Sequence, residues 1–206
     1  MKEQEMKQLG YDSDCFRNAM NKVVQMIQIM IDTERPHDMV PAIFAEYRAS
    51  DIETGLMIIG APDIFREGID RNLALFELGS ALAEHKYIIY SIFMAAEAWA
   101  VTQQGAEAAS LEADYGDINP SEQEDRYEII HIAGYRLDGM EAVCSMPIVR
   151  DEENRINLGE PEFVFDTEEK KMIKGITMRS LMDGYLTKVA ETTEMRKMRI
   201  DLNGRS

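Results

Sequence analysis

The sequence contains few cysteines and no segment typical of a secreted protein. Its two cysteines, Cys15 and Cys144, are far apart and fit no spacing typical of a metal site or a redox motif. The first residues, MKEQEMKQLG, include no apolar run of the signal-peptide type. These absences predict a reducing, cytoplasmic setting, with Cys144 as a buried structural thiol.

Common catalytic and nucleotide-binding motifs are also absent. The sequence has no GxSxG, no P-loop, no GxGxxG and no HExxH. Its three histidines, His37, His85 and His131, are scattered without metal-ligand spacing, and we interpret them as structural. We therefore expect no cofactor and no bound metal, and no catalytic constellation is recognisable.

Long hydrophobic runs are absent except for Tyr87–Val101 (YIIYSIFMAAEAWAV), in which only Ser91 and Glu97 are not apolar. This run is too short, and too closely flanked by charge, to cross a bilayer comfortably. In the first half of the run, alternate residues would point to opposite faces of a strand, and both sets are mainly apolar. This pattern is typical of a strand covered on both faces. We expect the rest of the fold to be organised around this central strand.

Basic residues are scarce relative to acidic ones. Lys and Arg number 22 and Asp and Glu number 38, so the net charge is 22 − 38 = −16. Residues 170–206 carry nine basic and four acidic residues, a net charge of +5, which leaves −21 on residues 1–169. Such an acidic body repels nucleic acid and anionic membranes. We expect no membrane partner, and contact with nucleic acid only through the basic tail.

The first half of the chain predicts two helices and a hairpin. Apolar residues between Asp14 and Thr33 form one helical stripe, with Ser13 as a plausible N-cap and Pro36 ending the helix. We expect this helix to pack on the sheet, with dimerisation as the alternative. A hairpin and a second helix covering the sheet are predicted at Val40–Ala49, Leu56–Ala61 and Ile64–His85.

The second half predicts an antiparallel meander and a helical end. Strands are expected at Tyr127–Arg136, Glu141–Val149 and Glu162–Phe165, with an Asp138-Gly139 turn after the first and a polar connection over 150–157 after the second. The fold class is therefore α+β, with a mostly antiparallel sheet of about six strands. We predict a single acidic domain over residues 1–168 and a basic helical tail over 169–206.

The most promising site follows the central strand. Glu97 lies beside the only tryptophan, Trp99, where a carboxylate next to an indole can have a raised pKa. A structural pairing of Glu97 with an arginine is the alternative. Glu97 and Arg126 are the candidates for catalysis, and Trp99 is a candidate for binding.

A long acidic connection separates Trp99 from Arg126. Seven acidic residues and one basic residue occur between Glu107 and Arg126. Connections of this length are uncommon in compact domains unless they are functional or disordered. Carboxylates in this segment can attract a cation or a basic partner, although their spacing fits no EF-hand, and a solvated loop is the simpler interpretation. The predicted binding residues here are Asp114, Asp117, Glu122 and Asp125.

Short motifs around this connection resemble a diffuse group of proteins from phage and prokaryotic genomes that has no established activity. The resemblance covers about residues 64–160 and includes Glu97-Ala98-Trp99, Pro120-Ser121-Glu122, Asp125-Arg126, Ile148-Val149-Arg150-Asp151 and Leu158-Gly159. It implies a phage or mobile-element setting and assigns no catalytic residue.

Three functions remain open from the sequence. The first is an acidic binding protein that engages a basic protein surface. The second is a structural or assembly subunit of a homo-oligomer, in which the tail contacts a neighbour. The third is a small metal-assisted hydrolase that uses Glu97 and the acidic segment 114–125.

Overall fold

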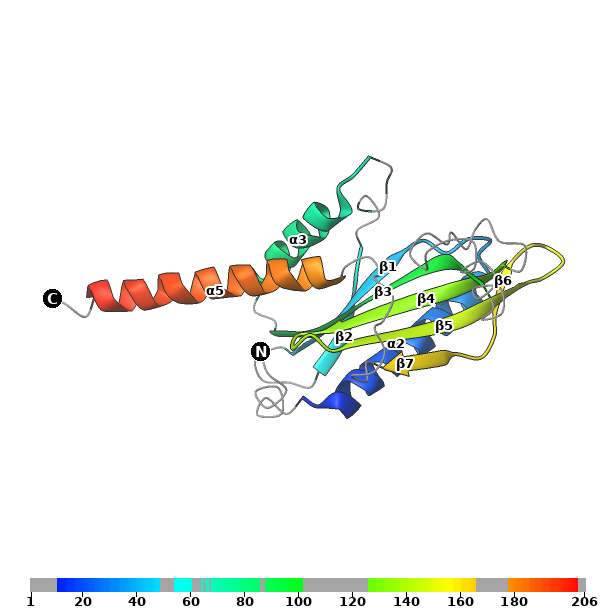
Figure 1. Cartoon of the computed structure of the whole chain (residues 1–206), viewed down its shortest axis with the longest axis horizontal. Coiled ribbons are helices and arrows are strands. Elements are labelled where there is room, and N and C mark those ends of the chain that lie inside the picture. Colours follow the sequence, from blue (N-terminus) through cyan, green and yellow to red (C-terminus); the bar gives the residue numbers. More distant parts are fainter. Residues whose placement is uncertain are drawn as a thin grey trace, which may run out of the picture.

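Strand β3 (Ile88–Val101) lies at the centre of an antiparallel sheet, as its apolar alternation predicts (Figure 1). A computed structural model describes residues 11–48, 54–60, 64, 66, 68–85, 88–101, 126–165 and 178–203. The sheet has seven strands in the order β2-β1-β3-β4-β5-β6, with β7 also paired to β5. The predicted α+β class is confirmed, with one strand more than expected.

The remaining strands follow the predicted hairpin and meander. Their bounds are Ala42–Arg48 for β1, Thr54–Ile59 for β2, Arg126–Arg136 for β4, Glu141–Arg150 for β5, Ile156–Leu158 for β6 and Glu162–Phe165 for β7. Every pairing between them is antiparallel. Strand β6 was not predicted, because its three residues follow a run of charged side chains that is typical of a loop.

Helix α2 (Ser13–Glu34) packs its apolar stripe on one face of the sheet, as predicted. Its Phe16 ring stacks on Phe93 of β3 with 5.6 Å between centroids. The N-cap is Asp12 rather than Ser13, because the Asp12 carboxylate accepts a hydrogen bond from the backbone NH of Cys15. The stripe is therefore covered by the sheet of its own chain, which is the first of the two arrangements expected.

Helices α3 (Arg71–Leu82) and α5 (Met178–Asn203) form a second layer, and α5 extends well beyond the sheet (Figure 1). The prediction that the second helix begins near Ile64 and is buried against the sheet was wrong. Asp70 caps α3 through the NH groups of Asn72 and Leu73, which sets its start at Arg71. Its main neighbour is α5 rather than a strand.

Two glycines allow α3 and α5 to approach closely. A Cβ atom added at Gly79 of α3 would lie 1.9 Å from the backbone oxygen of Leu181, and one added at Gly184 of α5 would lie 2.0 Å from that of Phe76. Only residues without a side chain permit such contact between two helix backbones. The close neighbour of Gly79 is therefore a helix and not a strand of the sheet.

The α3–α5 layer lies on the face of the sheet opposite to α2. Arg136 of β4 lies over the Phe16 ring of α2 at 5.9 Å, whereas the adjacent Tyr135 lies in the electrostatic field of Arg179 and Asp183 of α5. Successive strand residues point to opposite faces, so the two helical layers are separated by the sheet. Among the described helices, none combines the length and the hydropathy needed to span a bilayer.

Candidate functional site

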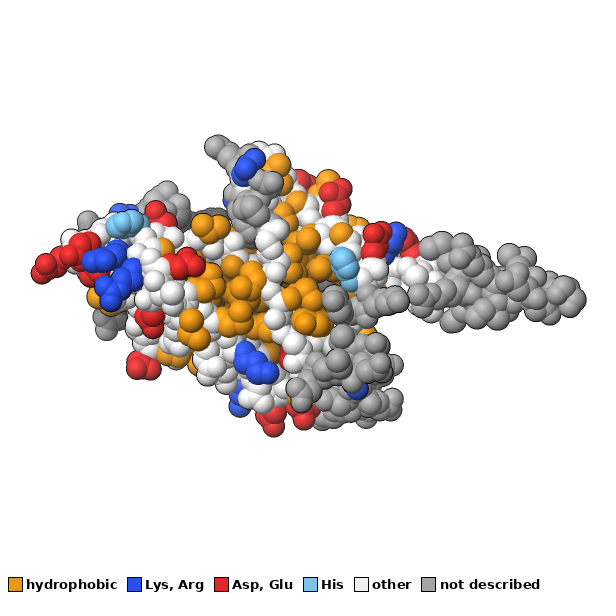
Figure 2. Space-filling view, turned by 180° about the vertical axis from the view of Figure 1, so that it is seen from behind, with side chains coloured by type: hydrophobic (Ala, Val, Ile, Leu, Met, Phe, Trp, Pro, Cys, Tyr) orange, Lys and Arg blue, Asp and Glu red, His pale blue; other side chains and the backbone are white. Residues whose placement is uncertain are grey.

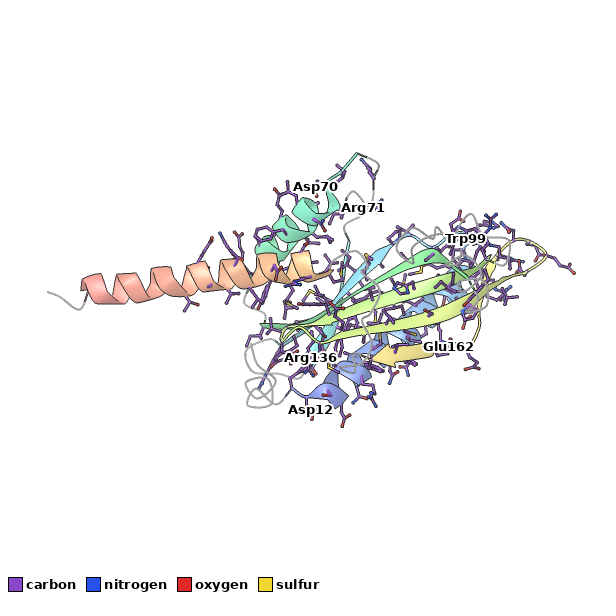
Figure 3. All side chains as sticks on the ribbon, viewed as in Figure 1. Asp12, Asp70, Arg71, Trp99, Arg136 and Glu162 are labelled. Carbon is purple, nitrogen blue, oxygen red and sulfur yellow. The ribbon has the colours of Figure 1, made fainter. Side chains whose placement is uncertain are left out.

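Trp99 lies at the end of the sheet that is remote from α5 and from the start of α2 (Figure 3). Glu97 and Trp99 occupy β3, and their neighbours across the strand pair are Ile130 and Glu128 of β4. Arg150 ends the next strand, β5. The fold therefore brings Glu97, Trp99, Arg126, Glu128 and Arg150 together, and we call this group the Trp99 end.

Arg150 holds the carboxylates of this end. Its Nε donates to Glu128 at 2.6 Å, and its Nη2 lies 3.7 Å from the Glu97 carboxylate. Its Nη1 donates to the backbone oxygens of His37 at 2.5 Å and Asn154 at 3.4 Å. One guanidinium thus connects three adjacent strands with the α2–β1 linker and the β5–β6 turn.

This pairing determines what Glu97 can do. The Glu97 carboxylate also accepts a hydrogen bond from the backbone NH of Met39, so both of its oxygens are engaged. The hydrogen bond to Glu128, and then the charges of Glu128 and Glu97, raise the pKa of Arg150 above its ordinary value. A carboxylate whose two oxygens are both engaged in this way has a structural role, which agrees with the alternative of an arginine partner.

Trp99 and Arg126 form the exposed part of the Trp99 end. The Arg126 guanidinium lies over the Trp99 ring at 4.9 Å, and the ring remains 41% exposed. A cation over an indole is attracted to the negative face of the ring. Large aromatic side chains and arginine are also the residue types enriched in protein interfaces. This pair offers a contact surface rather than a catalytic group.

The four predicted binding carboxylates, Asp114, Asp117, Glu122 and Asp125, lie outside the described residues. The ends of their segment are nevertheless located, because β3 ends at Val101 and β4 begins at Arg126, and these two residues pair in the sheet. The segment therefore starts and finishes beside Trp99. Within the described part of the chain, no group of three or more His, Cys, Asp or Glu side chains is arranged to hold a metal ion.

A second polar cluster, under the start of α2, was missed by the sequence analysis. Glu46 of β1 is buried, and its carboxylate accepts hydrogen bonds from Tyr11 and, at 2.8 Å, from Ser91. Burial raises the pKa of Glu46 above its ordinary value, although the two hydroxyl groups oppose this effect. No pattern in the sequence marks it, because Glu46 lies alone among uncharged residues inside a strand whose other charged residue, Arg48, is at its end.

The contacts of His131, His37 and Cys144 agree with the structural roles predicted for them. His131 lies within β4, and burial lowers the pKa of its imidazole. The His37 ring lies 3.3 Å from the backbone oxygen of Asn154, close to the chain segment that Arg150 holds. Cys144 is buried in β5, and burial raises the pKa of its thiol to about 12, so its thiolate is scarce at neutral pH.

Comparisons with known proteins identify no relative: the chain matches no protein-family model, no curated protein and no solved structure.

Proposed function

We propose that the chain is an acidic cytoplasmic protein that binds a basic surface on another protein through its Trp99 end. The observation that carries this proposal is the exposed Trp99–Arg126 pair at the point where the acidic segment leaves and rejoins the sheet. The indole supplies apolar contact area, and the carboxylates of residues 102–125 supply attraction to lysine and arginine side chains. A phage or mobile-element setting is part of this proposal and derives from the short sequence motifs.

The two other functions receive less support. A metal-assisted hydrolase would need Glu97 as a ligand or base, but this carboxylate is engaged by Arg150 and the NH of Met39. An assembly subunit in which α2 forms the oligomer would need its apolar stripe, which is buried on the sheet. The projecting helix α5 keeps one version of the assembly proposal open, because it could lie on a neighbour.

Trp99 allows a direct test, because it is the only tryptophan in the chain. We expect an arginine-rich peptide to quench or shift its fluorescence at low ionic strength. Binding should weaken by at least ~10-fold in ~0.5 M salt, since exposed charges are screened within a few ångströms there. An acidic peptide of the same length should give no change.

Matched variants locate the binding surface. Neutralising the acidic segment with Asp114→Asn, Asp117→Asn, Glu122→Gln and Asp125→Asn should weaken binding much more than neutralising four exposed carboxylates elsewhere, at Asp32, Glu34, Glu152 and Glu162. Both variants carry the same net charge. Equal loss in the two, or affinity that is independent of salt, would contradict the proposal.

A further inference from the structure

The two edges of the sheet differ in length and in charge. On one side, β5 pairs with the short strands β6 and β7, which have three and four residues. Arg155 precedes β6, and Pro161 immediately precedes β7, which begins at Glu162. Short edge strands with charges and proline are how natural sheets avoid pairing with other chains. This edge is therefore protected.

The opposite edge carries none of these protections. Strand β2 has six residues, and among the described strands its only neighbour is β1. The stretch 54–60 reads TGLMIIG, without charge or proline, in a chain of which 29% of the residues are charged. Its register with β1 is continuous, so no bulge turns the edge away.

The side chains of β2 add apolar surface to this edge. Ile58 is 50% exposed, whereas its cross-strand partner Phe44 is fully buried. Hydrophobic side chains also gather in the middle of the back of the molecule, with charged ones towards its periphery (Figure 2). An exposed apolar edge strand of this length is a site at which a further strand adds to a sheet.

We propose that β2 pairs in antiparallel fashion with β2 of a second copy about a twofold axis, which joins two sheets into one. Every second residue of β2 directs its NH and CO groups away from β1, and these groups form the new ladder. A twofold contact uses the same surface on both copies, so a single interface satisfies both open edges and closes the assembly as a dimer.

The absence of charge along β2 favours a second copy over a basic protein as the occupant. Two chains of net charge −16 repel one another, so a stable contact between them requires an uncharged surface. The stretch 54–60 meets this requirement, and its antiparallel self-pairing places no like charges opposite each other. A basic protein attracted by the acidic body gains no ion pair from this edge. The proposal is independent of the binding function of the Trp99 end.

The molecular mass in solution tests the dimer. We expect the wild-type chain to sediment at about twice its 23.5 kDa at micromolar concentration. Ile58→Lys places a charge within the new interface and should weaken the dimer on the order of 100-fold. Ile29→Lys is the matched control, because Ile29 is 64% exposed on α2, and this variant should remain dimeric.

Chemical cross-linking covers the case in which Ile58→Lys fails to fold, which circular dichroism would reveal. In a Cys15→Ser background, a short bifunctional maleimide should join two copies of the Met57→Cys chain and leave Ile29→Cys uncoupled. A wild-type chain that is monomeric at all concentrations, a folded Ile58→Lys variant that keeps the dimer mass, or no cross-link through residue 57 would each overturn the proposal.

Discussion

Arg150 is the residue on which the Trp99 end depends most. Its side chain is 21% exposed and its two carboxylate partners are each 26% exposed, so water screens the cluster only in part. Arg150→Met keeps the apolar stem but leaves Glu97 and Glu128 without this cation. We expect a loss of about 1–3 kcal/mol in the free energy of unfolding, measured with urea.

The control for this change is Arg179→Met on α5. Arg179 lies 3.8 Å from Asp183, and the two side chains are 69% and 55% exposed. An exposed pair of this kind contributes little, so its removal should change stability by less than ~0.5 kcal/mol. Similar losses in the two variants would show that Arg150 is not a structural centre of the site.

Glu46 gives stability an unusual dependence on pH. Because the folded chain binds the proton of this buried carboxyl more tightly than the unfolded chain, its contribution is complete below the ordinary pKa of 4.5 and is lost as pH rises through the higher folded-state pKa. Wild type should therefore lose stability relative to Glu46→Gln as pH rises above the ordinary pKa value of 4.5. Urea unfolding of both proteins at a series of pH values measures the difference.

In the comparison with Glu46→Gln, the contributions of the other carboxyl groups to the pH dependence cancel, because these groups titrate alike in the two proteins. Asp138 provides an internal contrast, because hydrogen bonding and ion pairing with Arg136 lower its pKa despite partial burial. Its contribution to stability has the opposite sign and is lost as pH falls. A wild-type-to-variant difference that is constant with pH, or that grows in favour of wild type as pH rises, would contradict the assignment to Glu46.

At this scale, the sequence identified residues but not their partners. Glu97 and Trp99 were predicted to lie close together because they are two positions apart on one strand. Arg126 was selected because it follows the connection that leaves this strand. Arg150 is 53 positions from Glu97 (150 − 97), and nothing in its own surroundings indicates that it pairs with this carboxylate. Long-range ion pairs of this kind depend on how several strands are aligned, which the pattern of any one strand does not reveal.

The pair of α3 and α5 depends on close contact between helix backbones. Gly184→Ala would place its Cβ 2.0 Å from the Phe76 oxygen, which forces the helices apart. The higher helix propensity of alanine offsets about 1 kcal/mol, and overpacking costs about 1–3 kcal/mol or more. We expect a net loss of about 1–2 kcal/mol, measured by thermal or urea unfolding.

Gly60→Ala is the reference for this experiment, because a Cβ at that position meets nothing within 4 Å. Faster amide exchange in α3 and α5 should accompany the loss in Gly184→Ala, while β4 keeps its protection. If Gly184→Ala is as stable as wild type, then the two helices adapt to a methyl group and the glycines are not required.

At the scale of elements, periodicity predicted which faces are buried but not against what. The apolar stripe of α2 predicted a helix packed on the sheet, and the apolar alternation of β3 predicted a central strand. Both predictions were correct. The apolar residues of α3 fit a sheet or a helix equally well, and only the glycines of α3 and α5 distinguish the two. Strand β6 is too short for any period to be seen.

The whole molecule divides its charge between the sheet domain and the projecting part of α5. Residues 194–206 contain four basic and two acidic residues, so truncation after Thr193 changes the net charge from −16 to −18. Because this part of α5 extends away from the sheet (Figure 1), we expect the melting temperature to change by less than ~2 °C. The oligomeric mass should also be unchanged.

This truncation separates two kinds of assembly. If the basic end of α5 lies on the acidic body of a neighbour, then its removal should dissociate the oligomer, whereas pairing through β2 does not need it. Light scattering on the full and shortened chains at equal concentration distinguishes these outcomes. A shortened chain that is monomeric while the full chain is a dimer would favour the tail as the contact.

The glycine contact also determines when the molecule can be completed during synthesis. Gly184 follows Gly79 by 105 positions (184 − 79), and every strand of the sheet is translated in between or before. The sheet and α2 can thus form on the ribosome, whereas α3 has no helix partner until α5 has emerged. The nascent chain therefore exposes α3 for most of the translation that follows it, and a chaperone that acts on this protein would find its target there.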